Sequence, residues 1–210
     1  MEVNDRAPFR LTYRASIAGC HAARTMTFNL ASLGDADILS PAVLLFGLWL
    51  CWAGVMQTVR GAFLGLAIVA AVTFALKWIV ASPGGATLWP DGTLISQYFP
   101  SGHAALATAV YGSLSIVLAA AGGGAWRYAP IAALVLAVAI AASRVLMRLH
   151  PIGDAFFGVV IGLAAPIATY FGVIRETRPF PRAGWILLAF LAALAAGWLV
   201  PAPVHEFVGV

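Results

Sequence analysis

Charged residues are scarce in this chain. Asp, Glu, Lys and Arg make up only 10% of its 210 residues, whereas 62% of the residues are hydrophobic. A soluble domain is usually about one quarter charged and about half apolar. The composition therefore excludes an ordinary soluble globular protein. It indicates an integral membrane protein with room for one compact bundle.

Cysteine and clustered acidic residues are also nearly absent. The two cysteines, Cys20 and Cys51, suggest neither a disulfide framework nor a metal-binding knuckle. The few acidic residues show no metal-ligand spacing, so we expect no metal and no cofactor. The net charge of +4 comes from Arg residues in short loops. That pattern fits membrane orientation and anionic head groups rather than nucleic acid.

What the chain does have is long apolar runs. A membrane-spanning helix needs about 20 mostly apolar residues, and six runs come close to that length. They are continuous rather than alternating and rich in Ala and Gly, as in closely packed helices rather than barrel strands. The runs are 38–56, 60–81, 102–121, 128–147, 152–174 and 183–200. The sequence predicts an all-α integral membrane bundle of about six transmembrane helices over 38–210, after an N-terminal interfacial segment at 1–37.

Six spans place successive loops on alternate sides of the membrane. One side receives the N-terminal segment, the loop 82–101, the junction 144–151 and the C-terminal tail. The other side receives five arginines in short loops: Arg60, Arg127, Arg175, Arg178 and Arg182. The positive-inside rule predicts that the Arg-rich side is cytoplasmic and that loop 82–101 faces the periplasm or the exterior. An additional weak span at 15–33 would move only the N-terminus.

Polar residues gather at the ends of four consecutive predicted spans on the side of loop 82–101. Ionisable residues close to membrane spans are costly and often functional. Such residues also have ordinary structural roles, because Lys and Arg at span ends extend to head groups and a serine often only caps a helix. Their conjunction at one face favours an active site. The residues are Lys77, His103, Arg144, Arg148, His150 and Asp154.

The stretch "HPIGD" at 150–154 carries a possible nucleophile. Pro151 suits the first position of a helix, which predicts His150 at the N-cap. Residues four apart share a helix face, so we expect Asp154 to hydrogen bond to His150. A carboxylate on one imidazole nitrogen orients the ring and raises the basicity of the other nitrogen. The pair is therefore a candidate nucleophile or base.

The stretch "PSGH" at 100–103 lies at the start of the predicted helix 102–121. Ser101 is a good N-cap, and Gly102 allows a ligand to approach the backbone. A helix N-terminus has unpaired N–H groups and partial positive charge, which suits a phosphate. His103 is a second imidazole that can act as an acid, and Arg144 can hold phosphate oxygens in a bidentate contact.

Two motifs together resemble a known family. "PSGH" at 100–103, followed by "SRVLMRLHPIGD" at 143–154, is similar to the type-2 phosphatidic acid phosphatase family. The third motif of that family is Ser-Arg, five residues, His, three residues, Asp, which residues 143–154 match without a gap. The family is related to vanadium-dependent haloperoxidases and soluble acid phosphatases, but the membrane spans argue against those branches. Its first motif is Lys, six residues, Arg-Pro. Here Lys77 is present, while Gly84 and Gly85 stand at the Arg-Pro positions.

The resemblance implies a metal-independent phosphatase. His150 would attack phosphorus and form a phosphohistidine, with Asp154 orienting it. His103 would protonate the leaving oxygen and then activate water. Four groups would bind the phosphoryl oxygens: Lys77, Ser101, the Gly102 N–H and Arg144. The auxiliary candidates are Arg148 and Ser143, and Arg148 is a candidate to replace the absent arginine.

Three functions remain open on the sequence alone. The first is a lipid phosphate phosphatase at the outer face of an inner membrane. Its substrates would be lipids such as undecaprenyl diphosphate or another polyprenyl diphosphate, phosphatidate, phosphatidylglycerol phosphate or a lipid A phosphate. The second is a non-catalytic protein that binds anionic lipid, which the absent motif arginine supports. The third is a lipid phosphotransferase. In each case the expected partners are a lipid phosphate and membrane lipids.

Overall fold

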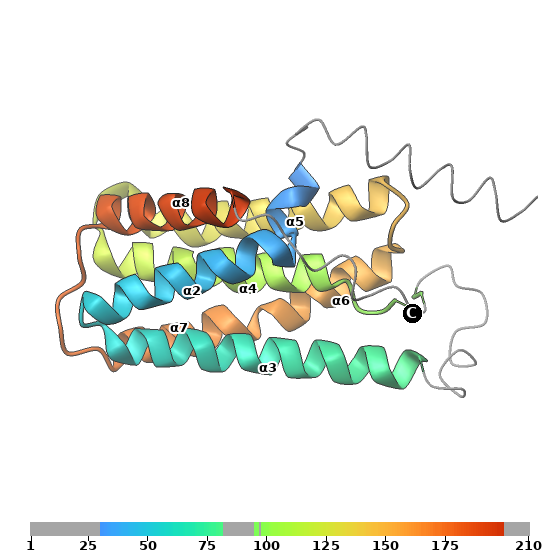
Figure 1. Ribbon diagram of the computed structural model, residues 1–210, viewed down its shortest axis with the longest axis horizontal. Coiled ribbons are helices and arrows are strands. Elements are labelled where there is room, and N and C mark those ends of the chain that lie inside the picture. The colour runs from blue at the N-terminus through green and yellow to red at the C-terminus, as the bar shows by residue number, and fades with distance from the viewer. Residues whose placement is uncertain (1–29, 82–94, 97, 200–210) are drawn as a thin grey trace, which may run out of the picture.

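Helices make up the whole regular structure of residues 30–81, 95–96 and 98–199, which are the residues that this computed structural model describes (Figure 1). The predicted all-α class is therefore confirmed. The α-helices are α2 (Ala36–Trp52), α3 (Met56–Ala81), α4 (Gly102–Ala121), α5 (Ala129–Leu146), α6 (Ile152–Gly162), α7 (Ala164–Ile174) and α8 (Ala183–Leu199). Two short 3₁₀ helices, η1 (Leu30–Gly34) and η3 (Gly124–Tyr128), precede α2 and α5.

The observed helices follow the six predicted apolar runs closely. α6 and α7 adjoin through Leu163 and together form one continuous apolar span over residues 152–174. Four helical stretches are long and apolar enough to cross a membrane: α3, α4, η3 with α5, and α6 with α7. The other two apolar helices, α2 and α8, have 17 residues each. Over the residues that the structure describes, the chain is a membrane helical bundle with four long and two shorter apolar helices.

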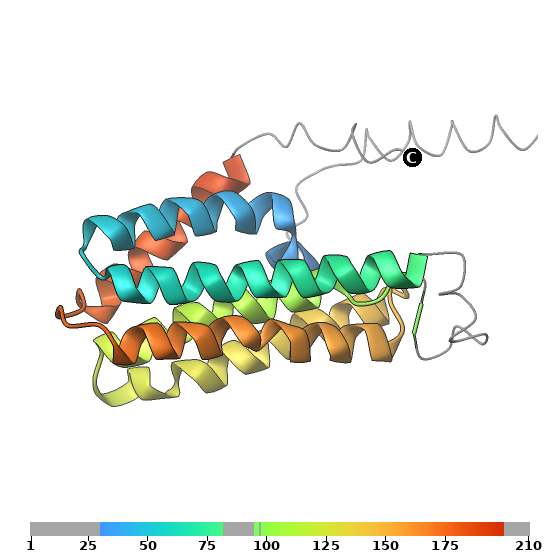
Figure 2. The ribbon, with the colours of Figure 1, turned by 90° about the horizontal axis from the view of Figure 1, so that it is seen from below.

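The helices run side by side, and α4 lies in the middle of the bundle (Figure 1). It packs most extensively against α5, α6 and α7, and it also contacts α2, α3 and α8. α3 runs along α7, and α2 pairs with α8, which crosses it in the view of Figure 2. The central helix is therefore in contact with nearly every other described element.

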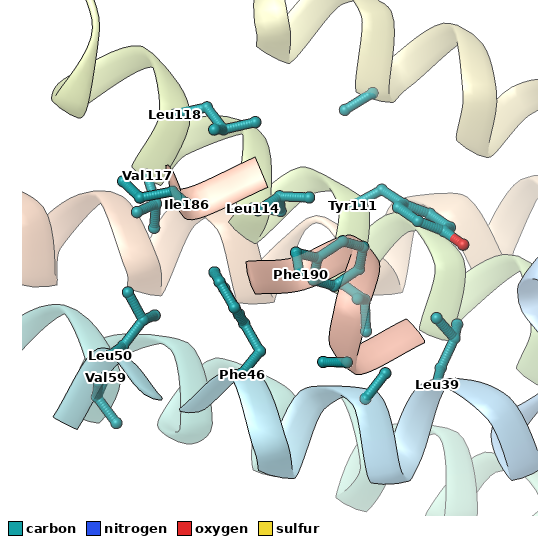
Figure 3. Close-up of a cluster of buried hydrophobic side chains, with 14 of the residues drawn as sticks. Leu39, Phe46, Leu50, Val59, Tyr111, Leu114, Val117, Leu118, Ile186 and Phe190 are labelled. Atoms are coloured by element: carbon teal, nitrogen blue, oxygen red, sulfur yellow. The ribbon is translucent and has the colours of Figure 1, made fainter. Parts of the chain in front are cut away.

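A cluster of apolar side chains joins α2, α4 and α8 (Figure 3). Phe190 of α8 lies at its centre, with its ring centroid 5.4 Å from that of Phe46 and 6.1 Å from that of Tyr111, both in edge-on arrangements. Aromatic pairs favour this geometry. Tyr111 also donates a hydrogen bond from its hydroxyl to the Leu33 carbonyl at 2.9 Å, which ties η1 to α4.

Glycines let the helices on the other side of α4 approach closely. A Cβ added at Gly61 would lie 2.5 Å from the Ala168 carbonyl oxygen, and one at Gly65 would lie 2.5 Å from the Ala165 Cα. Gly158 and Gly162 of α6 face α4 in the same way. Small residues spaced four apart are typical of packed helices in membranes, where close van der Waals contact stabilises the pairing.

The outer surface of the bundle is apolar along the helices. Large side chains point outward with more than half of their surface exposed: Leu48, Leu64, Phe74, Val135, Ile167 and Leu188. An exposed apolar surface of this extent is typical of contact with lipid. The arginines of the short loops lie at the end of the bundle where α3 begins and α7 ends, opposite the end where α4 begins (Figure 1).

Candidate active site

The predicted site residues meet at one end of the bundle. α3 and α5 end there, and α4 and α6 begin there (Figure 1). Residues 98–101 lead into α4 and lie against the start of α6, since the Ser101 N–H donates a hydrogen bond to the Asp154 carbonyl at 3.0 Å. That backbone contact joins the two sequence motifs directly.

Asp154 and His150 form the predicted hydrogen bond. His150 Nδ1 lies 3.0 Å from Asp154 Oδ2, so Nε2 is the imidazole nitrogen that does not engage this carboxylate. The Asp154 side chain is completely buried. A buried carboxylate is tolerated only when hydrogen-bond donors or a counter-charge surround it. The prediction from four-residue spacing is therefore confirmed as geometry.

Ser96 supplies the other donors to Asp154. Its backbone N–H donates to Oδ1 at 3.0 Å, and its hydroxyl donates to Oδ2 at 2.5 Å. Together with His150, these donors satisfy both oxygens of the carboxylate and fix its direction. Ser96 lies outside the sequence motifs, and a serine in a loop does not by itself indicate a function. Only the fold brings it to α6.

One detail of the prediction at this helix is wrong. α6 begins at Ile152 with Pro151 at its N-cap, so His150 lies one residue before the cap rather than on it. The reason is that Pro151 is extended, with ψ at 161°, and the His150 N–H bonds back to the Arg144 carbonyl at 3.4 Å. His150 thus belongs to the turn that ends α5, while Asp154 belongs to α6.

That turn has an unusual backbone. Arg148 adopts φ of 56°, a left-handed conformation that costs a residue with a Cβ about 1–2 kcal/mol. The Leu149 N–H donates to the Arg144 carbonyl and the Arg148 N–H to the Val145 carbonyl, the two bonds of a Schellman motif, where glycine is usual. The Arg148 side chain is exposed at the bundle end.

The start of α4 presents an open helix N-terminus. Ser101 is at the N-cap, as predicted, but its hydroxyl makes no cap hydrogen bond. The Ser101 Oγ is buried and has no hydrogen-bond partner within the described part of the chain. Apart from its chain neighbours and its own helix backbone, no atom of the described residues lies within 4 Å of the position that a Cβ on Gly102 would take. The first turn of α4 therefore has space in front of it and a hydroxyl ready to bind a ligand.

The remaining motif residues lie near the ends of α3 and α5. Arg144, in the last turn of α5, has a buried Nε without a hydrogen-bond partner among the described residues. Lys77 donates a hydrogen bond to the Tyr98 carbonyl at 2.9 Å and so holds the end of α3 against the segment before α4. The Ser143 hydroxyl donates to the Ile140 carbonyl at 2.6 Å within its own helix.

A cavity of about 240 Å³ opens between α3 and α4 beside this N-terminus. Lys77 and Gly102 line the same cavity as the hydrophobic side chains of Leu66, Val69 and Leu106. Cationic and backbone N–H groups therefore stand next to an apolar channel. This combination suits a ligand with an anionic head and a hydrocarbon tail.

His103 pairs with a residue that the motifs do not contain. Its Nε2 lies 2.7 Å from Oδ1 of Asp35, at the junction of η1 and α2. Asp35 belongs to none of the sequence motifs, and only the fold brings it to His103. Gly84 and Gly85, where the family motif has Arg-Pro, lie outside the described residues, so their effect on the site stays a prediction.

The fold and the geometry together define a class of protein: a helical membrane protein whose motif histidines, each paired with a carboxylate, lie at one end of the bundle. The chain belongs to the PAP2 superfamily, whose model matches residues 58–178, more than half of the chain. The resemblance in the motifs is thus confirmed, and family membership supports phosphatase activity in general. Comparisons with curated proteins and with solved structures find no match.

Proposed function

We propose that this protein hydrolyses a lipid phosphate or diphosphate through a phosphohistidine. The observation that carries the proposal is that Ser101 Oγ and Arg144 Nε are buried without hydrogen-bond partners among the described residues. An unpaired buried polar group costs about 1–3 kcal/mol. A phosphoryl group bound at the start of α4 would pair with both atoms.

The phosphoryl oxygens would be held by four groups that carry hydrogen-bond donors. The Gly102 N–H belongs to a helix N-terminus, which favours anions. Arg144 offers a planar pair of donors and Lys77 a point charge, both of which stabilise the charge that develops in the transition state. Ser101 contributes its hydroxyl. In this proposal the cations of the chain itself neutralise the phosphate.

The chemistry would proceed in two steps. In the first, Nε2 of His150 attacks phosphorus, the N–P bond forms as the P–O bond breaks, and His103 gives a proton to the leaving oxygen. In the second, a water molecule gives a proton to His103 and its oxygen attacks phosphorus, so that the N–P bond breaks and phosphate leaves. Asp154 keeps a hydrogen on Nδ1 of His150 throughout and stabilises its positive charge.

The apolar cavity beside Lys77 and the lipid-facing surface support a lipid rather than a soluble phosphate ester. We favour a polyprenyl diphosphate, because the chain is small and its site is proposed to face outward. Support for this orientation comes from the arginines at the opposite end of the bundle, since the positive-inside rule favours the cytoplasmic side for them.

A substrate panel tests the proposal. Purified protein is mixed with polyprenyl diphosphate, phosphatidate and phosphatidylglycerol phosphate, and released inorganic phosphate is measured. We expect release from at least one lipid, and loss of turnover in His150→Ala. His205→Ala, outside the matched region, is the control and should retain activity.

Three other outcomes would contradict parts of the proposal. Lipid binding without phosphate release indicates an anionic-lipid-binding protein. Transfer of labelled phosphate to a second lipid rather than to water indicates a phosphotransferase. Activity that survives His150→Ala shows that another residue is the nucleophile.

A further inference from the structure

We propose that Asp35 is the positioning carboxylate of His103, an assignment that rests on the proposed function. Asp35 lies outside residues 58–178, so the family match does not include it. In this arrangement each of the two histidines is held by its own acid. Asp154 holds Nδ1 of His150 at 3.0 Å, and Asp35 holds Nε2 of His103 at 2.7 Å.

The first support is the use that Asp35 makes of its side chain. It occupies the N-cap of α2, where an Asp side chain usually accepts a hydrogen bond from the helix backbone. Here the side chain makes no cap hydrogen bond. The backbone carbonyl of Asp35 accepts from the Leu39 N–H at 2.9 Å, as an N-cap carbonyl normally does. The carboxylate therefore leaves its own helix and reaches across to α4.

The second support is the way η1 is fixed against α4. The Leu33 carbonyl accepts a hydrogen bond from Tyr111, and the backbone of Gly34 packs directly on His103. A Cβ added at Gly34 would lie 3.3 Å from the Cβ of His103 and 3.0 Å from a methyl group of Ile140. This contact places the residue after Gly34 next to the imidazole. Asp35 is thus held in register with His103 by packing on two helices.

In this geometry the two ring nitrogens of His103 have different roles. An Nε2–H that donates to the carboxylate leaves Nδ1 to give a proton to the leaving oxygen and later to take one from water. The side chains of His103 and Asp35 keep 29% and 40% of their surface exposed, so water and the leaving group can reach them. A carboxylate partner of this kind fixes the ring orientation and tautomer. Asp35 acts through His103 and does not touch the substrate.

Asp35→Asn tests the assignment, because it keeps the size of the side chain and removes its charge. We expect kcat for a lipid alkyl phosphate to fall roughly 10- to 100-fold, with KM nearly unchanged. A general acid typically accelerates a reaction about 10²- to 10⁴-fold, and loss of its positioning residue should remove part of that acceleration. A nitrophenyl phosphate needs no proton on its leaving group, so its first-turnover burst of nitrophenolate should keep its rate. Asp35→Glu should restore part of the activity. The control is Asp37→Asn, the same change two residues further along the chain, which should leave kcat for the alkyl phosphate unchanged.

A double variant makes the test independent of the aryl substrate. If Asp35 acts through His103, then Asp35→Asn added to His103→Ala should cause no further loss. An equal fall for the alkyl phosphate and for the nitrophenolate burst, an additive double variant, or no fall at all would overturn the assignment.

Failure of the proposed function is distinguishable from failure of this inference. Wild-type protein without activity on any lipid phosphate contradicts the proposed function alone. Nitrogen NMR of ¹⁵N-histidine-labelled protein then tests the pair, with His103→Gln used to assign the signal. We expect the Nε2–H tautomer of His103 in the wild type and its loss in Asp35→Asn. An unchanged signal in the variant overturns the pair.

Discussion

Two hydrogen bonds from Ser96 hold the buried carboxylate that orients His150. The carboxylate of Asp154 has no exposed surface, so its direction depends entirely on protein donors. His150 supplies one donor and Ser96 supplies two. Ser96, which belongs to none of the motifs, therefore does at least as much as His150 to fix the direction of this carboxylate.

Ser96→Ala should weaken this site. The substitution removes the hydroxyl donor and leaves the backbone N–H. A hydrogen bond to a charged group contributes about 1.5–3 kcal/mol, and if about 1.4 kcal/mol of that is felt in the transition state, kcat falls roughly tenfold. Thermal unfolding in detergent and phosphate release measure the two effects. Ser40→Ala, at an exposed position on α2, is the control, and equal behaviour of the two variants would contradict the role of Ser96.

Arg148 is held in a left-handed backbone conformation that glycine adopts without strain. Arg148→Gly should therefore raise the free energy of unfolding by about 1 kcal/mol. If the exposed guanidinium is an auxiliary phosphate ligand, the same change should raise KM roughly two- to fivefold, the value of a solvent-exposed ion contact.

Denaturant unfolding and steady-state kinetics measure these opposite effects of Arg148→Gly. Arg175→Gly is a matched control, because Arg175 ends α7 with φ of −87° and no strain to relieve. A stabilised Arg148→Gly protein with unchanged KM would show that Arg148 does not replace the absent motif arginine.

At the scale of elements, the contact between α4 and α6, called here the α4–α6 seam, positions the proposed catalytic residues. A Cβ added at Gly158 would lie 2.6 Å from the Ser101 carbonyl oxygen and 2.9 Å from the Cβ of Ala104. The bond from the Ser101 N–H to the Asp154 carbonyl lies one turn away on the same seam. Close contact of the two helices therefore sets the distance between the two motifs.

Gly158→Ala should push these helices apart. We expect a loss of about 1–3 kcal/mol in stability from overpacking and a larger fall in kcat, since Asp154 moves away from the start of α4. Thermal unfolding and turnover measure both. Gly184→Ala on α8 is the control, because no atom lies within 4 Å of the added Cβ. A Gly158→Ala protein as stable and active as this control would show that the seam tolerates separation.

The elements themselves were largely predictable. The run 102–121 coincides with α4, and the other predicted spans end within a few residues of their helices. Hydropathy is a local property, so it locates spans well. The N-cap predicted from "HPIGD", rather than any span predicted from hydropathy, was wrong by one residue, because the extended Pro151 takes the N-cap and the hydrogen bonds of the turn after α5 hold His150 before it.

At the scale of the whole molecule, the polar site and the arginine-rich loops lie at opposite ends of the bundle. This separation predicts an orientation that labelling can measure. In a background of Cys20→Ala and Cys51→Ala, Leu149→Cys marks the site end and Gly123→Cys marks the other end. Leu149 is 49% exposed, and a Cβ at Gly123 meets no atom within 4 Å.

A membrane-impermeant maleimide should label Leu149→Cys in intact spheroplasts and label Gly123→Cys only after lysis. The physical reason is that positively charged loops are retained in the cytoplasm. The opposite pattern would place the site in the cytoplasm and would contradict the proposed outer-face substrate.

The division of the chain at residue 37 also stays a prediction, although residues 30–37 pack on the bundle.

The sequence by itself determined the membrane class, the helices and the His150–Asp154 pair. Apolar run length and four-residue spacing act within one helix, and neither depends on how helices pack. Only the tertiary structure decided which side chains complete the site. Asp35 and His103 are separated by 68 positions in the chain, and Ser96 and Asp154 by 58. Contacts over such separations form because α4 packs against α5 and α6 and holds η1 beside it, and no local pattern encodes that packing.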